Sequence, residues 1–329
     1  MLRILHDTNY DFIRWWKVMA AITIAFIVLG LGSLAIKPLN LSIEFTGGTL
    51  LQLEFTQPPD VGMIRSTLDQ AAIKGAEIQQ FGTNREFTVR AQDPAAVASQ
   101  SKGAEAIAVS IERVLKQKFG EKNLRVIRTE AVGPRVGSEL KRGAIIAILL
   151  SFLITLVYLS IRFEWRFATA AVIATSHDVF TTIAFLKLMH LEISLTVVAG
   201  LLTVLGYSLN DTIIIFDRVR ENLRKGRKET LYETLNRSIN ETLPRSVLTH
   251  ATVFAATLSL LIFAGEVIRP FAWVMAFGVV TGTFSSIYVA APVLLWIERK
   301  WPRKTGVRQS SSTATPTSRT RPSPATATR

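Results

Sequence analysis

The sequence predicts an α-helical polytopic membrane protein with six transmembrane helices and an extracytoplasmic α+β ferredoxin-like domain between helices 1 and 2. Of its 329 residues, 49% are hydrophobic and the mean hydropathy is +0.30, which is high for a soluble protein. Six apolar runs are each about long enough to cross a hydrocarbon core of about 30 Å. The first two runs are separated by a long charged segment that has the patterns of a soluble α+β domain.

The chain begins with a short polar stretch, 1–17, which we expect to be a cytoplasmic N-terminus. Trp15 and Trp16 lie near the end of this stretch, just before the first apolar run, where aromatic residues mark a membrane interface. The apolar run 18–36 follows. It is longer than the apolar region of a secretory signal and has no clear small-x-small cleavage site before Lys37, so we expect a retained first transmembrane helix.

Segment 37–142 predicts the soluble domain. Alternation of apolar and polar residues predicts a strand near 49–55, and later strands are expected within 76–90 and at 124–129. Apolar residues at helical spacing predict helices within 58–73 and 95–119, the second ending before Gly120. The resulting order β-α-β-β-α-β is that of a ferredoxin-like unit.

The other predicted transmembrane runs are 143–161, 167–187, 193–216, 247–264 and 271–297. Segments 1–17, 162–166, 217–246 and 298–329 would then share one side of the membrane, and they hold 21 of the 38 Lys and Arg residues. The opposite segment, 37–142, is nearly balanced, with 15 Lys and Arg against 12 Asp and Glu. This is the positive-inside pattern, so we expect both termini in the cytoplasm. The same distribution argues against a nucleic-acid-binding protein, despite a net charge of +13.

Two cytoplasmic segments differ in character. In 217–246, Leu223, Leu231, Leu235 and Ile239 lie among basic residues, which favours an amphipathic interfacial helix over a solvated basic loop. Segment 298–329 is rich in Ser, Thr, Pro and Arg and cannot bury a core, so we expect disorder there. Its arginines predict generic contact with anionic lipid.

The fourth run contains polar residues at membrane depth. At helical spacing, one face would hold Gly200, Thr203, Tyr207, Asn210, Asp211 and Ile214. A carboxylate inside a bilayer costs several kcal/mol unless it is paired, protonated or hydrated, so Asp211 is a candidate functional residue. The alternative is that Asp211 only braces helix packing.

Two further spans carry charged groups. His177 and Asp178 lie in the third run, and Arg245 comes just before the fifth. Two carboxylates and a permanently charged guanidinium on neighbouring helices predict a proton relay of Asp211, Arg245, Asp178, Asn210 and His177. Two alternatives remain: Asp178 and His177 could be a packing pair, and Arg245 could extend to the lipid headgroups. His250 is expected to serve helix packing.

Enzymatic sites are not predicted. There is no cysteine, the four histidines include no His-x-x-x-His pair, and Gly206-Tyr-Ser-Leu lacks the second glycine of a nucleophile elbow. We therefore expect neither a metal nor a cofactor. Gly278, Gly282, Ser285 and Ser286 form a small-residue face that permits close helix approach, within the chain or with a partner. The polar and charged residues predicted on the membrane helices need to be covered, which favours a second membrane subunit.

Four motifs together resemble one family. They are Glu44-Phe45-Thr46-Gly47-Gly48, Gly133-Pro-Arg-Val-Gly-Ser-Glu-Leu140, His177-Asp178 and Gly206-Tyr207-Ser-Leu-Asn210-Asp211-Thr-Ile-Ile-Ile-Phe-Asp-Arg-Val-Arg-Glu-Asn222. This combination is similar to that of the SecF proteins of the SecD/SecF family, within the RND superfamily. The resemblance runs from the first span to about Trp296. Glu44 stands where many relatives have Asp, and Pro244 precedes Arg245, which bears on how that helix begins.

The resemblance implies a bacterial plasma (inner) membrane protein that pairs with SecD and works beside the SecYEG channel. It implies use of the proton-motive force to move unfolded exported polypeptide, with the proton pathway at the positions of Asp211 and Arg245. For Gly47 and Gly48 we expect a tight turn into the first strand. The rival hypothesis is one half of an RND-type proton-coupled exporter of small molecules or lipids. A scaffold without energy coupling is a third, and it predicts that Asp211→Asn is silent.

Overall fold

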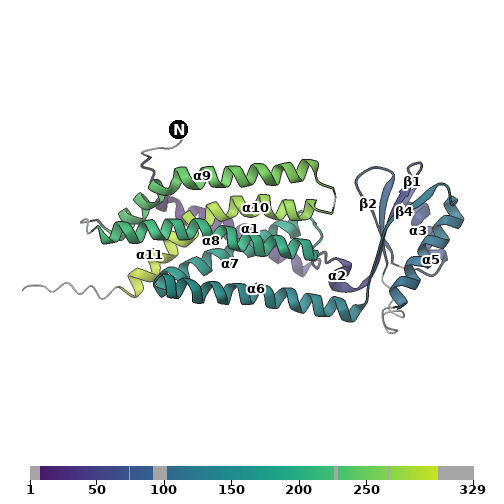
Figure 1. Cartoon of the computed structure of the whole chain (residues 1–329), viewed down its shortest axis with the longest axis horizontal. Coiled ribbons are helices and arrows are strands. Elements are labelled where there is room, and N and C mark those ends of the chain that lie inside the picture. The colour runs from purple at the N-terminus through teal and green to yellow at the C-terminus, as the bar shows by residue number, and fades with distance from the viewer. Residues whose placement is uncertain (1–7, 74, 92–101, 226–228, 266, 303–329) are drawn as a thin grey trace, which may run out of the picture.

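The chain folds into a long helical bundle with a small α+β domain at one end (Figure 1). The computed structural model describes residues 8–73, 75–91, 102–225, 229–265 and 267–302. The predictions made for 1–7, for 95–101 and for most of the tail 298–329 therefore lie outside the described residues.

Six helical segments in the described part are long and apolar enough to cross a membrane. The first combines η1 (Ile13–Trp15), α1 (Trp16–Gly32) and η2 (Ser33–Ala35), and the next four are α6 (Pro134–Arg162), α7 (Trp165–Leu188), α8 (Leu195–Arg224) and α9 (Leu231–Phe263). The sixth combines α10 (Arg269–Ser285), the π-helical turn η3 (Ser286–Ala290) and α11 (Ala291–Lys300). This confirms the prediction of six transmembrane helices.

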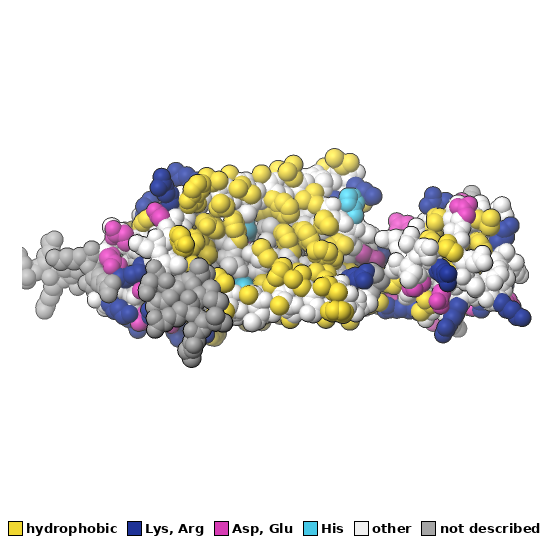
Figure 2. All heavy atoms as spheres, turned by 90° about the horizontal axis from the view of Figure 1, so that it is seen from above, with side chains coloured by type: hydrophobic (Ala, Val, Ile, Leu, Met, Phe, Trp, Pro, Cys, Tyr) yellow, Lys and Arg dark blue, Asp and Glu magenta, His cyan; other side chains and the backbone are white. Residues whose placement is uncertain are grey.

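An apolar band covers the middle of the bundle, with charged side chains at its two ends (Figure 2). In the most apolar 18 residues of each span, only 6% are buried within the protein for the first span and for α6. For α7 and for α8 the buried share is 56%. The helices α7, α8 and α10 form the interior of the bundle, where their polar side chains lie against one another. The helices α1 and α6 turn apolar side chains outward toward lipid.

The small α+β domain at the end of the bundle is called the outer domain below. It contains strands β1 (Gly48–Phe55), β2 (Glu77–Gln80), β3 (Glu86–Ala91) and β4 (Leu124–Val132), with helices α3 (Val61–Gln70) and α5 (Lys102–Phe119). The strand order is β2-β3-β1-β4 and all neighbours are antiparallel, which confirms the ferredoxin-like prediction. The inward residues of β1, Leu51, Leu53 and Phe55, are buried with Ile64 of α3 and Ile111 of α5.

Several helices extend beyond the predicted apolar runs. The helix α6 begins at Pro134, so the motif that starts at Gly133 forms its first turns rather than a separate entry segment. Segment 217–246 holds no separate interfacial helix in its described residues: it supplies the last turns of α8 and the first turns of α9. Thr230 and Glu233 form a capping box that starts α9 here, and α9 then runs through Pro244 without ending.

Candidate functional site

Asp211 of α8 is buried between α8 and α9. Its side chain is 2% exposed, and its Oδ1 accepts a short hydrogen bond from Oγ of Ser246. Its Oδ2 is also buried and has no hydrogen-bond partner among the described residues. A carboxylate at membrane depth with one oxygen unpartnered is poorly compensated as an anion, so this position suits a group that binds and releases a proton.

The neighbours of Asp211 connect two helices. Nδ1 of His250 lies 2.6 Å from the carbonyl oxygen of Ser246, one turn away on α9, and Nε2 of His250 is buried and unpartnered among the described residues. The hydroxyl of Tyr207 donates to the carbonyl of Thr249 at 3.2 Å, and the Tyr207 and His250 rings meet edge to face at 5.1 Å. Asp211, Ser246, His250 and Tyr207 therefore form one cluster, which we call the Asp211 cluster.

Asp178 of α7 has a different environment, although it is equally central. It is fully buried, and its Oδ2 accepts hydrogen bonds from Ser285 of α10 at 2.7 Å and, at shorter range, from Ser208 of α8. Its Oδ1 lies 3.1 Å from Nδ1 of His177. The two serine hydroxyls donate to the carboxylate, and His177 also donates to it when Nδ1 carries the proton, so Asp178 joins three helices and both of its oxygens have partners.

The structure does not bring the predicted relay together. Arg245 is exposed, and Asp211 instead contacts the next residue, Ser246. Asn210 is also exposed, so the predicted polar face of α8 is divided: Asp211 points toward α9, while Thr203, Gly206 and Asn210 lie along an uncovered line. The physical reason is that a helix turns 100° per residue, so adjacent residues 210 and 211 face different neighbours.

The small-residue face on the sixth span serves packing within the chain. A Cβ built on Gly278 would lie 2.2 Å from a Val204 methyl, and one on Gly282 would lie 3.1 Å from Cβ of Ser208. The hydroxyl groups of Ser286 and Thr212 are 2.8 Å apart. This close approach of α10 to α8 places Ser208 and Ser285 beside Asp178.

The Glu44 motif connects the outer domain to α8. Residues Ile43–Thr46 form the single helical turn α2, and Gly47 and Gly48 follow with φ of +73° and +125°, a region that favours glycine. A Cβ on Gly47 would lie 2.8 Å from Cα of Pro134, the first residue of α6. The motif is therefore a tight turn pressed against the start of α6.

The carboxylate of Glu44 acts on α8 directly. Its Oε2 accepts a hydrogen bond from the backbone N–H of Leu195, the first residue of α8, at 2.6 Å, while Ser194 caps Val197. The first N–H groups of a helix have no partners within it, and a negative charge is favourable there. Glu44 thus completes the N-terminus of the helix that carries Asp211.

A second set of contacts lies beside this cap. Arg90 of β3 forms a short ion pair with Glu192, in the connection from α7 to α8, and also donates to the carbonyl of Leu41 at 3.2 Å. Ile193 pairs its backbone with the segment before α2, through Asn40 at 2.7 Å and Ser42 at 2.9 Å. Burial raises the pKa of Glu192 above its ordinary value, and Arg90 acts in the opposite direction.

Sequence reasoning missed Ser246, Ser208, Arg90 and Glu192, and it gave His250 only a packing role. Ser246 and His250 are four residues apart, and that spacing on α9 was the available signal for a polar stripe. Ser208 lies four residues before Thr212 in the same way. Arg90 and Glu192 are far apart in the chain, and no local pattern relates them.

The sequence of this chain matches models and members of one protein family. Residues 111–300 match the family model "Protein export membrane protein SecD/SecF, C-terminal", and residues 32–59 match "SecD/SecF GG Motif". The protein translocase subunit SecF of Gemmatimonas aurantiaca is 62% identical over 305 residues, covering 92% of this chain and 91% of that protein. The SecF of Vibrio alginolyticus is 40% identical over 289 residues, covering 88% and 90%.

The crystal structure of SecDF from Thermus thermophilus, described as a translocon-associated membrane protein, matches with a TM-score of 0.80 and 34% identity over 91% of this chain. A structure of SecDF in a super-membrane-facing form matches with a TM-score of 0.65 and 35% identity over 90% of this chain. The chain spans about 40% of the length of each of these SecDF chains. By sequence and by fold, the chain belongs to the SecF branch of the SecD/SecF family of protein-export membrane proteins.

Proposed function

We propose that this chain is the SecF subunit of a complex that uses the proton-motive force to promote protein export through the Sec channel. Asp211 supports this proposal most directly, because it is 2% exposed inside the bundle, with one carboxylate oxygen bonded to Ser246 and the other unpartnered among the described residues. Protonation and deprotonation at this position would change how α8 and α9 pack, because the two helices meet at the Asp211–Ser246 contact.

The contacts of Glu44 and Arg90 support transmission of this change to the outer domain. α8 runs without a break from Leu195, which Glu44 caps, to Asp211 and beyond. A shift of α8 would therefore act on the turn at Gly47 and, through Glu192, on β3. In this proposal the outer domain then moves relative to the membrane and acts on the unfolded exported polypeptide.

We propose SecD as the partner that covers the exposed line of polar and small residues on α8, beside the Asp211 cluster. Thr203, Gly206 and Asn210 are exposed along one line of α8, and Arg245 is exposed on α9. Polar side chains on an outward face of a membrane helix are costly in lipid, so a second membrane subunit is the natural neighbour. Arg245 would contribute to the proton pathway in that assembly. Further partners would be the SecYEG channel and anionic lipid, in a bacterial plasma membrane with both termini in the cytoplasm.

The test uses inverted membrane vesicles that contain the Sec channel and a preprotein stalled in mid-translocation, with ATP withdrawn. Vesicles with this chain and its SecD partner should complete translocation when a proton gradient is imposed, and vesicles without the pair should not. Gradient-driven transport of a small dye by the pair, with no effect on the preprotein, would contradict the proposal and favour the RND-type exporter.

A further inference from the structure

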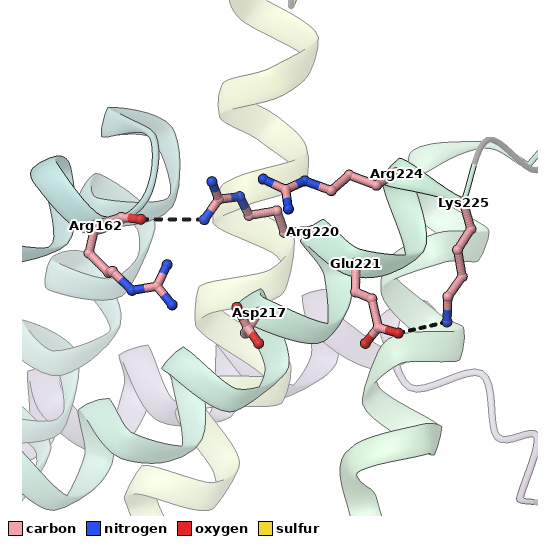
Figure 3. Close-up of a pocket in the computed structure, with 6 residues that line it drawn as sticks. All are labelled: Arg162, Asp217, Arg220, Glu221, Arg224 and Lys225. Carbon is pink, nitrogen blue, oxygen red and sulfur yellow. Dashed lines mark hydrogen bonds and ion pairs between the residues drawn. The ribbon is translucent and has the colours of Figure 1, made fainter.

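Three arginines gather at the ends of α6 and α8 that lie away from the outer domain. Arg162 is the last residue of α6, and Arg220 and Arg224 are one turn apart on α8. Figure 3 shows their side chains reaching into the space between the two helices. Together with Asp217, Glu221 and Lys225 they line a hollow of about 570 Å³.

Two of these guanidinium groups are held in position by the protein. Arg220 donates from Nη1 to the carbonyl oxygen of Arg162 at 3.4 Å. The Cζ atoms of Arg162 and Arg220 lie 5.1 Å and 5.9 Å from the centroid of the Phe163 ring, within the range of a cation–π interaction. Because Phe163 is buried against Phe167, it fixes both cations. The hollow is therefore pre-organised.

The positive charge of the hollow is only partly compensated. Glu221 is occupied by Lys225 at 2.8 Å and by Arg218 at 2.7 Å. In the described part of the chain, Arg162, Arg220 and Arg224 form no ion pair with a carboxylate. Like charges one helical turn apart, as in Arg220 and Arg224, are destabilising, and an anion between them would remove that cost.

The surroundings indicate which anion fits. The last turns of α6 expose apolar side chains up to Arg162, and Ile161 is 83% exposed. The other large apolar residues exposed on this half of α6 are Leu149, Leu150, Leu153, Ile154, Val157 and Tyr158. In a membrane these side chains contact acyl chains, so the hollow lies at the level of the headgroups. The planar guanidinium group matches phosphate oxygens in a two-pronged geometry.

We propose that Arg162, Arg220 and Arg224 bind the phosphodiester headgroup of an anionic phospholipid, whose acyl chains lie along the exposed face of α6. The site is distinct from generic attraction of a basic tail, because three cations from two helices converge on one hollow. The proposal requires only insertion in a membrane, and it stands apart from the energy coupling proposed above.

The test measures retained lipid. The full chain, purified with its SecD partner, is reconstituted in nanodiscs with equal phosphatidylglycerol and phosphatidylcholine, extracted in mild detergent, and analysed by native mass spectrometry. The wild type should retain phosphatidylglycerol in about tenfold preference, and the triple variant Arg162→Gln, Arg220→Gln, Arg224→Gln should lose that preference. A charge-matched control, Arg299→Gln, Arg319→Gln, Arg321→Gln, should keep it.

Three results would overturn the proposal: equal retention by wild type and triple variant, an equal loss in the control, or displacement of the lipid by added inorganic phosphate. The last would show a site for soluble phosphate. If the triple variant does not elute as a single folded complex, Arg224→Gln alone replaces it, because Arg224 is exposed and lies outside the Phe163 contacts. That variant should lower the preference by about threefold, and no change would count against the site. Translocation is not measured, so failure here leaves the export proposal unaffected.

Discussion

The carboxylate of Glu44 accepts a 2.6 Å hydrogen bond from the backbone N–H of Leu195. The residue that opens the Gly47-Gly48 turn therefore caps the helix on which Asp211 lies, about 24 Å further along at 1.5 Å per residue. One rigid element thus connects the outer domain to the buried carboxylate.

Removing this cap should destabilise the chain. Glu44→Ala leaves the N–H of Leu195 without its acceptor and removes a favourable charge at the helix N-terminus, so we expect a loss of about 1 kcal/mol in unfolding free energy. The thermal unfolding midpoint of the purified chain measures it. Glu54→Ala, at an exposed position of β1, is the matched control, and equal midpoints for the two variants would contradict the capping role.

Glu192, at the contact between β3 and the α7–α8 connection, should make the stability of the protein depend on pH. Burial, which is the largest cause, together with the nearby carboxylates of Glu44 and Glu77, raises the pKa of Glu192 above its ordinary value of 4.5, and Arg90 only partly opposes this. A raised pKa in the folded state means that the contribution of Glu192 to stability is full below about pH 4.5 and is lost as pH rises through the folded-state pKa. The wild type should therefore lose stability relative to Glu192→Gln as pH rises through that range. The measurement is the unfolding midpoint of the wild type and of Glu192→Gln from pH 4 to pH 8. A difference between the two midpoints that stayed constant over this range would refute the prediction.

Asp178 should prove to be a packing residue. Asp178→Leu would leave the buried hydroxyl of Ser208 without its acceptor, at about 1–3 kcal/mol, whereas Ser285 can still donate to the carbonyl of Gly282 at 3.2 Å. Asp178→Asn keeps an acceptor oxygen, so it should retain gradient-driven translocation with a modest loss of stability. A translocation rate in Asp178→Asn that falls at all pH values would show instead that the charge is needed.

A buried glycine of α10 and an exposed glycine of α8 should respond differently to the same substitution. A Cβ on Gly278 would lie 2.2 Å from Val204, so Gly278→Ala should cost about 1–3 kcal/mol through overpacking. A Cβ on Gly206 would meet nothing within 4 Å among the residues that the structure describes, so Gly206→Ala should not lower the stability of the purified chain. Because we place SecD on that surface, the same change should weaken co-purification with SecD. Unaltered co-purification would argue that the partner lies elsewhere.

The sequence predicted the transmembrane helices and the ferredoxin-like order because both depend on local periodicity. It could not assign partners to the buried carboxylates. Asp211 and Asp178 were both candidates for a relay, and only the packing of α9 and α10 shows that one is bonded to a single serine and the other to two serines and a histidine. Arg245 was predicted to pair with Asp211, but its place on the outer side of α9 depends on helix rotation, which periodicity alone does not determine. The Glu44–Leu195 and Arg90–Glu192 contacts join residues far apart in sequence, so no motif could predict them.

If protonation of Asp211 drives export, a side chain that cannot titrate at this position should abolish the gradient-driven step. Completion of translocation of the stalled preprotein, under a proton gradient and without ATP, is compared among wild type, Asp211→Asn and the matched intramembrane control Asp178→Asn. We predict completion in wild type and in Asp178→Asn, and a rate at the gradient-free background in Asp211→Asn. Completion in Asp211→Asn at the wild-type rate would show that export does not depend on protonation of Asp211, since the amide that replaces the carboxylate does not titrate.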